Sequence, residues 1–313
     1  MANKTIIVTG GAGFIGSHIC DWLIDEGDKV VCVDNLVTGK KDNIKLLLRH
    51  PNFTFMEQDV SRGLKIAGPV DQIYHMSSPA SPIDYQKLPI ETMMVNSLGT
   101  KNMLDMANEK RARILLASTS EVYGDPEKHP QTEDYWGHVN PIGPRSCYDE
   151  SKRFAEALAM AFNKMHYVDV KIARIFNTYG PRMRANDGRV IPNFVMQALK
   201  GYDITIYGDG SQTRSFCYIT DMVDGLTRLM NSGKSGEIVN MGNPDERKVV
   251  DVAKMIRDMT NSNSKITFHP LPKDDPTRRK PDITRAKDKL GWEPIISFEA
   301  GMKKTIDWFS TQM

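Results

Sequence analysis

The chain has 313 residues, of which 40% are hydrophobic and 26% charged, so it is large enough for one large or two medium globular domains. Its formal net charge is only +2 and its basic residues are spread out, which gives no reason to expect a nucleic-acid partner. No stretch approaches about 18 uninterrupted apolar residues, so no membrane partner is expected either. The four cysteines lie far apart and the seven histidines lack metal-ligand spacing, so we expect a cytoplasmic protein without a metal site.

The N-terminal segment has the pattern of a dinucleotide-binding unit. A β-branched run at Thr5–Thr9 predicts a buried strand, and it leads into a glycine-rich turn and a helical pattern that ends at Gly27. The N–H groups and the positive dipole end at such a turn suit the pyrophosphate of a dinucleotide. The next predicted strand, Lys29–Asp34, ends in an acid that would bind the adenosine ribose of NAD and repel the 2′-phosphate of NADP.

The glycine spacing in the stretch TGGAGFIGSH resembles the extended short-chain dehydrogenase/reductase superfamily. This resemblance implies that Asp59 lies beside the adenine ring, and that NAD is the cofactor. The residues predicted to bind NAD come from the glycine turn, the end of the second strand, the segment around Asp59 and a later helix: Gly10, Gly13, Phe14, Ile15, Gly16, Asp34, Asn35, Thr38, Asp59, Val60, Tyr148 and Lys152.

The catalytic residues are predicted between positions 119 and 152. A strand pattern at Arg113–Thr119 is followed by a helical pattern in which Tyr148 and Lys152 lie four residues apart, so their side chains are neighbours. A free phenol titrates near ~10, but an adjacent ammonium group favours the phenolate. Tyr148 is therefore expected to remove a hydroxyl proton while hydride leaves the same carbon. The resemblance implies that Thr119 binds that hydroxyl and that Lys152 also holds the nicotinamide ribose.

Three kinds of nucleotide-sugar enzyme share this machinery: 4-epimerases, 4,6-dehydratases and decarboxylases. The dehydratases carry T-D-E, whose aspartic acid protonates a departing hydroxyl, whereas here Ser120 holds that position and is a poor general acid. Epimerases usually carry neither acid, so Glu121 favours the decarboxylase. A dehydratase or an epimerase is the alternative, and a non-catalytic NAD-binding protein is disfavoured by the intact Thr119, Tyr148 and Lys152.

The likeness to the UDP-glucuronate decarboxylase family runs from end to end of the chain. It is carried by Thr119–Arg153, His75–Tyr85, Arg174–Val190, Tyr207–Phe216 and Asp274–Ile283. It implies oxidation of UDP-glucuronate at C4, loss of carbon dioxide from the resulting β-keto acid, and return of the hydride to give UDP-xylose without net consumption of NAD. Tyr148 and Thr119 would stabilise the enolate oxygen, and Glu121, through water or Ser120, would handle the proton at C5.

The same resemblance implies which residues bind the UDP-sugar substrate. Arg279 and the loop around Ser81 and Tyr85 would contact the sugar and its carboxylate, and other residues would bind the uridine and the diphosphate. The complete predicted set is Ser81, Tyr85, Asn177, Arg189, Tyr207, Arg214 and Arg279. Glu91 and Met94 depart from the resemblance, because lysines are expected at these positions.

We therefore expect an α/β fold. A Rossmann-type, doubly wound parallel sheet is predicted over residues 1–180, and a smaller α/β domain for the substrate over residues 181–313. Predicted strands at Phe216–Thr220 and Glu237–Met241 are expected to return to the main sheet. Helices around Glu91–Ala107 and Cys147–Met165 would pair two copies into a homodimer, as the resemblance implies.

Overall fold

The protein is described by a computed structural model covering residues 3–271 and 278–313. Residues 274–277, which begin one of the motif stretches named above, therefore lie outside the described residues. The main feature is a sheet of seven parallel strands in the order β11-β6-β5-β4-β1-β2-β3. Its strands are β1 (Thr5–Thr9), β2 (Lys29–Asp34), β3 (Phe53–Glu57), β4 (Gln72–His75), β5 (Arg113–Thr119), β6 (Val170–Ile175) and β11 (Glu237–Met241). The predicted Rossmann-type sheet is confirmed.

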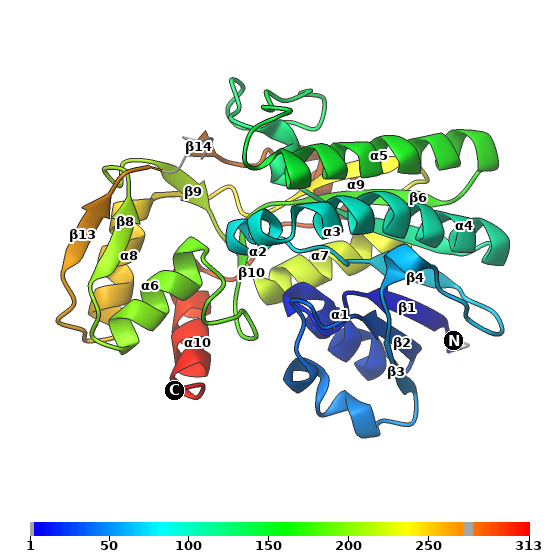
Figure 1. The fold of residues 1–313 in the computed structure, drawn as a ribbon, viewed down its shortest axis with the longest axis horizontal. Helices are drawn as coiled ribbons and strands as arrows, with labels where there is room; N and C mark the ends of the chain where they lie inside the picture. The colour runs from blue at the N-terminus through cyan, green and yellow to red at the C-terminus, as the bar shows by residue number, and fades with distance from the viewer. Residues whose placement is uncertain (1–2, 272–277) are drawn as a thin grey trace.

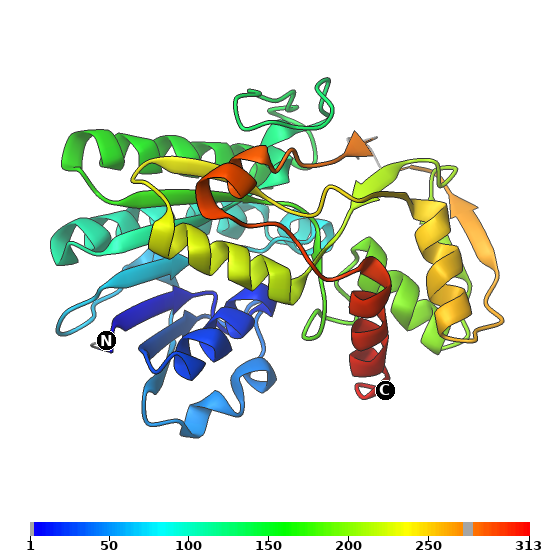
Figure 2. The ribbon, with the colours of Figure 1, turned by 180° about the vertical axis from the view of Figure 1, so that it is seen from behind.

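Helices cover both faces of this sheet (Figure 1). One face carries α3 (Pro89–Met94), α4 (Thr100–Lys110) and α5 (Ser146–His166), and α2 (Pro82–Lys87) lies at its end near the second lobe. The opposite face, which Figure 2 turns toward the reader, carries α1 (Phe14–Asp25), α7 (Ile219–Ser232) and α9 (Thr284–Leu290). Within the described part of the chain, no helix is long and apolar enough to cross a lipid bilayer.

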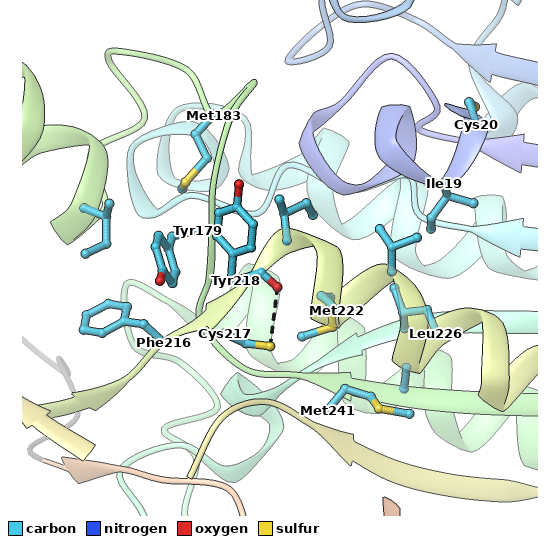
Figure 3. Close-up of a cluster of buried hydrophobic side chains, with 14 of the residues drawn as sticks. Ile19, Cys20, Tyr179, Met183, Phe216, Cys217, Tyr218, Met222, Leu226 and Met241 are labelled. Carbon is cyan, nitrogen blue, oxygen red and sulfur yellow. Dashed lines mark hydrogen bonds between the residues drawn. The ribbon is translucent and has the colours of Figure 1, made fainter. Parts of the chain in front are cut away.

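Alternation along the strands explains why both faces are covered. In β1, Ile6 and Val8 belong to the core under α1 and α7, whereas Ile7 belongs to the core under α4 and α5. Successive side chains of a strand point to opposite faces, so a strand apolar on both faces must be buried between two helical layers. Figure 3 shows the α1/α7 side, where Ile19 of α1 and Leu226 of α7 belong to one cluster of buried side chains.

The second lobe is smaller and is built from short strands and three helices. Parallel strands β8 (Ile204–Tyr207) and β13 (Ile266–His269) form one pair, and β9 (Thr213–Ser215) pairs with β12 (Glu246–Lys248) and β14 (Arg278–Arg279). The helices are α6 (Val190–Leu199), α8 (Val249–Met259) and α10 (Phe298–Ser310). All of these lie beside one end of the main sheet in Figure 1.

The two strands expected to return to the main sheet behave differently. Glu237–Met241 forms β11 and pairs in parallel with β6 at the edge of that sheet. The prediction for Phe216–Thr220 is wrong: only β10 (Cys217–Tyr218) is extended, and it pairs with β7 (Thr178–Tyr179) in a separate sheet. The reason is that Ile219 already begins α7, so the apolar run that suggested a longer strand is the first turn of a buried helix.

Candidate active site

A cavity of about 960 Å³ is lined by residues of both lobes, including those at the carboxyl ends of central strands such as Thr119 at the end of β5. It is lined by every residue that the sequence analysis predicts for cofactor, substrate and catalysis, from Gly10 on the glycine turn to Arg279 on β14. Ligands of doubly wound sheets bind at this place, where loops after neighbouring parallel strands diverge. The structure thus gathers residues from both lobes around one cavity.

The glycine turn is so tightly packed that only glycine fits at two of its positions. Gly10 has φ +68°, and a Cβ there would lie 2.8 Å from the backbone of Met76 and Ser77. A Cβ on Gly16 would lie 2.2 Å from the carbonyl oxygen of Gly10. No side chain caps α1, whose N-cap is Gly13, and its first turn carries no acid. The first N–H groups of α1 are therefore available to an anion, which fits the pyrophosphate of NAD.

We expect Gly16→Ala to weaken NAD binding. The added methyl group must push the turn apart, and overpacking of this kind costs about 1–3 kcal/mol, which corresponds to roughly ten- to hundredfold in affinity. Calorimetric titration with NAD measures the effect. Gly27→Ala is the matched control: this glycine follows the other end of α1 at φ +85° with open space around it, so stability should fall while NAD affinity stays the same. Equal affinities of wild type and Gly16→Ala would contradict the assignment of the turn.

Asp34 is the last residue of β2, Asp59 follows the end of β3 by two residues, and both line the cavity. The buried Asp34 carboxylate accepts hydrogen bonds from the N–H groups of Ala12 at 3.0 Å and Leu36 at 2.8 Å. Burial raises the pKa of Asp34, and these two donors act in the opposite direction. Asp59 caps the 3₁₀ turn η3 (Val60–Arg62) by accepting from the N–H and the hydroxyl of Ser61. Both acids thus order loops that line the cavity.

Tyr148 and Lys152 lie one turn apart on α5 and are almost completely buried. Lys152 Nζ donates to the carbonyl oxygen of Ala117 at 2.8 Å and lies 5.8 Å from the centre of the Tyr148 ring. Burial lowers the pKa of Lys152 to about 7 and raises the pKa of Tyr148, while a hydrogen bond with Thr119 favours the Tyr148 phenolate. Tyr148 and its hydrogen-bond partner Thr119 therefore both line the cavity, where they can reach a hydroxyl bound there, although burial alone disfavours the phenolate.

Tyr85 packs against Tyr148. The rings of Tyr85 and Tyr148 are stacked with centroids 5.1 Å apart and planes at 5°. Tyr85 is only 1% exposed, and its hydroxyl has no hydrogen-bond partner within the described part of the chain. The Tyr85 ring therefore fixes the plane of Tyr148, a contact that the sequence did not predict.

Ser81 has a structural task that the sequence analysis did not foresee. It is the N-cap of α2, accepting from the N–H of Asp84 at 3.3 Å and donating its hydroxyl to the Asp84 carboxylate at 2.8 Å. The Asp84 carboxylate in turn forms an ion pair with Arg184. Because the Ser81 hydroxyl is used in capping, the direct contact with sugar that we expected of it is disfavoured.

Glu121, in the 3₁₀ turn η5 (Ser120–Tyr123), is held between two arginines. Its carboxylate accepts from Arg145 Nη2 at 2.7 Å, from Arg279 Nη2 at 3.0 Å and also from Arg279 Nη1. Burial alone would raise the pKa of Glu121, but the two guanidinium groups hold it well below its usual range. An acid that stays ionised does not suit the proton transfer at C5 that we expected of it. Its geometry suits the orientation of Arg145 and Arg279 at the cavity wall.

The sequence analysis missed two members of this cluster, Arg145 and Asp149. Arg145 is the N-cap of α5 and lines the cavity. Asp149 is buried behind Tyr148, and its pKa is raised to about 8, first by burial and then by the negative charge of Glu121. Arg145 stands three residues before Tyr148, and that spacing is the only signal by which it was detectable.

The wall of the cavity formed by the second lobe is rich in arginine. Arg189 is paired with Asp187, and Arg214 donates to the carbonyl oxygen of its neighbour Thr213 at 2.8 Å. Tyr207 is half-exposed at the rim, and the carbonyl oxygen of Asn177 accepts from the N–H of Cys217. Two further arginines that follow β7, Arg182 and Arg184, also line the cavity, as does Arg62 on η3 of the first lobe. Forked guanidinium donors suit a diphosphate.

Comparisons with known proteins agree with this arrangement. Residues 7–305 match the family model described as GDP-mannose 4,6 dehydratase. UDP-glucuronic acid decarboxylase 1 of Danio rerio is 54% identical over 310 residues, covering 99% of this chain and 73% of that protein. UDP-glucuronic acid decarboxylase 5 of Arabidopsis thaliana is 52% identical over 302 residues, covering 96% of this chain and 88% of that protein.

A solved structure extends the comparison to the whole fold. UDP-glucuronic acid 4-epimerase from Bacillus cereus, in complex with UDP-glucuronic acid and NAD, superposes with a TM-score of 0.89 at 27% identity. The match covers 99% of this chain and 100% of the epimerase. The resemblance that the sequence motifs indicate is confirmed. The chain belongs to the UDP-glucuronic acid decarboxylase family, a branch of the extended short-chain dehydrogenase/reductases.

Proposed function

We propose that the protein converts UDP-glucuronate to UDP-xylose and carbon dioxide, using bound NAD that is regenerated in each cycle. The observation that carries the proposal is the T-S-E site. Ser120 replaces the acid needed to expel a hydroxyl, and Glu121 is fixed as an anion between Arg145 and Arg279. This site lacks the acid for dehydration and presents two guanidinium groups next to the catalytic tyrosine. The 52–54% identity to proteins named as decarboxylases supports the same reaction.

The residues that hold NAD are those of the glycine turn, together with Asp34, Asp59 and Lys152. NAD in this position supplies an acceptor for the C4 hydride of the sugar and, once reduced, the donor that returns it. The crowding of the glycine turn and the uncapped start of α1 support this assignment.

The protein's own residues then move protons and stabilise charge. Tyr148 removes the proton of the C4 hydroxyl, to which Thr119 is also hydrogen-bonded, and the nearby Lys152 ammonium favours the phenolate. Oxidation at C4 leaves a carboxylate on the carbon next to the ketone, and such a β-keto acid loses carbon dioxide as its electrons move into the carbonyl group. Tyr148, now carrying the proton, and Thr119 donate hydrogen bonds to the developing enolate oxygen. The enolate then takes a proton at C5 from solvent, and Tyr148 returns its proton to the C4 oxygen as hydride returns to C4. Arg145 and Arg279 around the single Glu121 carboxylate leave one net positive charge at the cavity wall, which balances the charge of the substrate carboxylate before carbon dioxide leaves.

The direct test is to incubate the purified protein with NAD and UDP-glucuronate, and to follow carbon dioxide, NADH and the nucleotide sugar by NMR. Equal amounts of carbon dioxide and UDP-xylose with no net NADH are expected. A UDP-4-keto-pentose with accumulating NADH would mean that the final reduction fails. UDP-galacturonate without carbon dioxide would identify a 4-epimerase and refute the decarboxylase.

The proposal includes a homodimer formed through α3, α4 and α5. Apolar side chains stand exposed on these helices and on the π-helical turn η4 (Val95–Gly99) between them: Ile90, Met93, Leu98 and Phe154. Exposed apolar patches of this kind mark protein–protein contacts in water. Light scattering of the eluted protein at micromolar concentration measures the mass, and a monomer would oppose this part of the proposal.

We also propose a cytoplasmic location. All four cysteines are buried and free, which suits a reducing compartment. Fractionation of cells that produce the protein tests the location directly.

A further inference from the structure

One face of α5 carries three ionisable residues at successive helical turns: Tyr148, Lys152 and Glu156. Two of these belong to the proposed reaction. The third, Glu156, lies outside the cavity lining and is only 8% exposed. A buried carboxylate is costly unless it is paired, so its position one turn from Lys152 calls for a physical reason.

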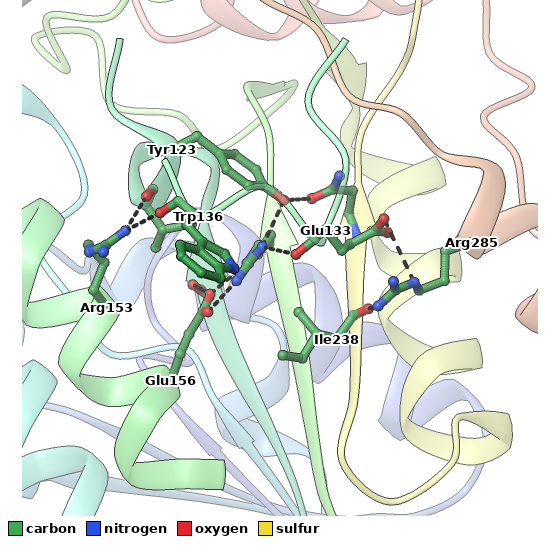
Figure 4. A network of polar contacts seen from close by, with 11 residues as sticks. Tyr123, Glu133, Trp136, Arg153, Glu156, Ile238 and Arg285 are labelled. Atoms are coloured by element: carbon green, nitrogen blue, oxygen red, sulfur yellow. Dashed lines mark hydrogen bonds and ion pairs between the residues drawn. The ribbon is translucent and has the colours of Figure 1, made fainter. Parts of the chain in front are cut away.

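Glu156 is fully engaged by neighbours from two strands. Its Oε1 accepts from Arg174 Nε at 2.9 Å and from the Ser118 hydroxyl at 2.5 Å, and its Oε2 accepts from Arg174 Nη2 at 2.7 Å. Arg174 also donates to the Tyr123 hydroxyl and to the carbonyl oxygen of Glu133, both at 2.9 Å. Figure 4 shows this network spanning α5, β6 and η5. The Glu156 carboxylate is therefore fixed in place.

Two of these contacts connect Glu156 to the catalytic groups. Ser118 is the residue before Thr119 at the end of β5, and Lys152 donates to Ala117 on the same strand. The Glu156 charge also acts on Lys152 through space: burial lowers the pKa of Lys152, and Glu156 raises it. The Glu156 carboxylate thus acts on Lys152 through its charge. It also contacts β5, the strand that ends at Thr119, through the hydrogen bond from Ser118.

The other ionisable groups around Lys152 do not supply a negative charge in place of Glu156. His75 on β4 is neutral, because burial lowers its pKa to about 3. On η5, Glu121 is paired with arginines and Tyr123 with Arg174. The charges of α4 are paired with each other, Lys101 with Asp105 and Lys110 with Glu109. Glu91 of α3 is exposed, and on α5 itself the pKa of Asp149 is raised to about 8, first by burial, which disfavours its charged form at neutral pH.

We propose that Glu156 is a positioning residue, whose fixed charge favours the ammonium form of Lys152 against burial and whose contact with Ser118 aligns the strand end that carries Thr119. The proposal deepens the proposed function and rests on it. It assigns Arg174 and Ser118 to holding the Glu156 carboxylate. The consequence is that the ionisation of the catalytic pair depends on a residue that touches neither cofactor nor substrate.

The test compares Glu156→Gln with Glu156→Asp through the pH dependence of kcat/KM for carbon dioxide release. Without the negative charge, Lys152 loses its proton at lower pH. The alkaline limb of Glu156→Gln should therefore move down by about 1 pH unit, and Glu156→Asp should recover most of the shift. Glu133→Gln is the matched control, since it removes another buried acid of the network that does not act on Lys152. A limb that stays in place despite lower activity, or that moves equally in the control, would overturn the proposal.

A second readout does not depend on the reaction. The pKa of Lys152 can be followed by NMR in protein with labelled lysines and without substrate, with the signal assigned by Lys152→Met. It should fall in Glu156→Gln, and an unchanged value would refute the role of Glu156. If Glu156→Gln does not fold, a double variant with Glu156→Gln and Arg174→Met takes its place in the titration. It removes both charges, so that no buried guanidinium group is left without its carboxylate. If wild type releases no carbon dioxide, the proposed function fails, while the titration still decides on Glu156.

Discussion

Tyr148→Phe should reduce carbon dioxide release at least about a thousandfold, since general-base catalysis contributes about 10²–10⁴ and the same hydroxyl also faces the enolate. The phenyl ring keeps its stacking on Tyr85, so the fold should change little. Single-turnover mixing of enzyme, NAD and UDP-glucuronate, with NADH absorbance as the signal, measures the oxidation step itself. The loss should appear there and not only in the overall rate.

Tyr85→Phe is the matched control for this experiment. It removes the hydroxyl oxygen of Tyr85, the ring stacked on Tyr148. This hydroxyl has no hydrogen-bond partner within the described residues. We expect its rate to stay within a few-fold of wild type. A large loss in Tyr85→Phe would mean that its hydroxyl contacts the sugar, as the sequence analysis expected. A Tyr148→Phe variant with near-normal oxidation would remove Tyr148 from the role of base.

Glu121→Gln should have the largest combined effect on activity and stability. The amide presents one oxygen and an NH₂ group to Arg145 and Arg279, which now share a carboxylate. Breaking a buried ion pair by removing one charge costs about 3–5 kcal/mol. Urea unfolding measures the stability, and we expect carbon dioxide release to fall strongly because Arg279 loses its orientation.

Asp149 should moderate this loss. The pKa of Asp149 is raised to about 8 partly by the negative charge of Glu121, so removing that charge lowers the pKa. Asp149 would then ionise near neutral pH and offset part of the missing charge beside the arginines. The variant with both Glu121→Gln and Asp149→Asn should therefore be less stable than the two single changes predict by addition. Strict additivity would contradict this coupling. The control for Glu121→Gln is Glu57→Gln, which breaks an exposed ion pair with Lys41. It should change neither carbon dioxide release nor the free energy of unfolding.

The sequence predicted those parts of the protein that depend on short stretches. The glycine turn, the strand ends at Asp34 and Thr119, and the Tyr148–Lys152 spacing are all local patterns, and the structure brings them to one cavity. What it did not predict depends on contacts between distant positions. Glu121 and Arg279 are 158 residues apart, and no local pattern reveals that the acid is locked by the arginine. Likewise, the ring of Tyr85 reaches Tyr148 only through the folding of α2 against α5.

Because β11 lies at the edge of the main sheet but follows β8 and β9 of the second lobe in the chain, the two lobes depend on each other for folding. The chain leaves the main sheet after β6, builds β8 and β9 of the second lobe, and returns as α7 and β11 before β12 and β13 follow. A polypeptide cut near residue 180 would expose β6 as an unpaired edge and uncover the apolar side of α1, where Leu226 of α7 now packs. The nucleotide-binding half is thus no transferable module. New substrate preferences in such an architecture must arise by changing side chains and loops around the cavity, not by exchanging one half for another.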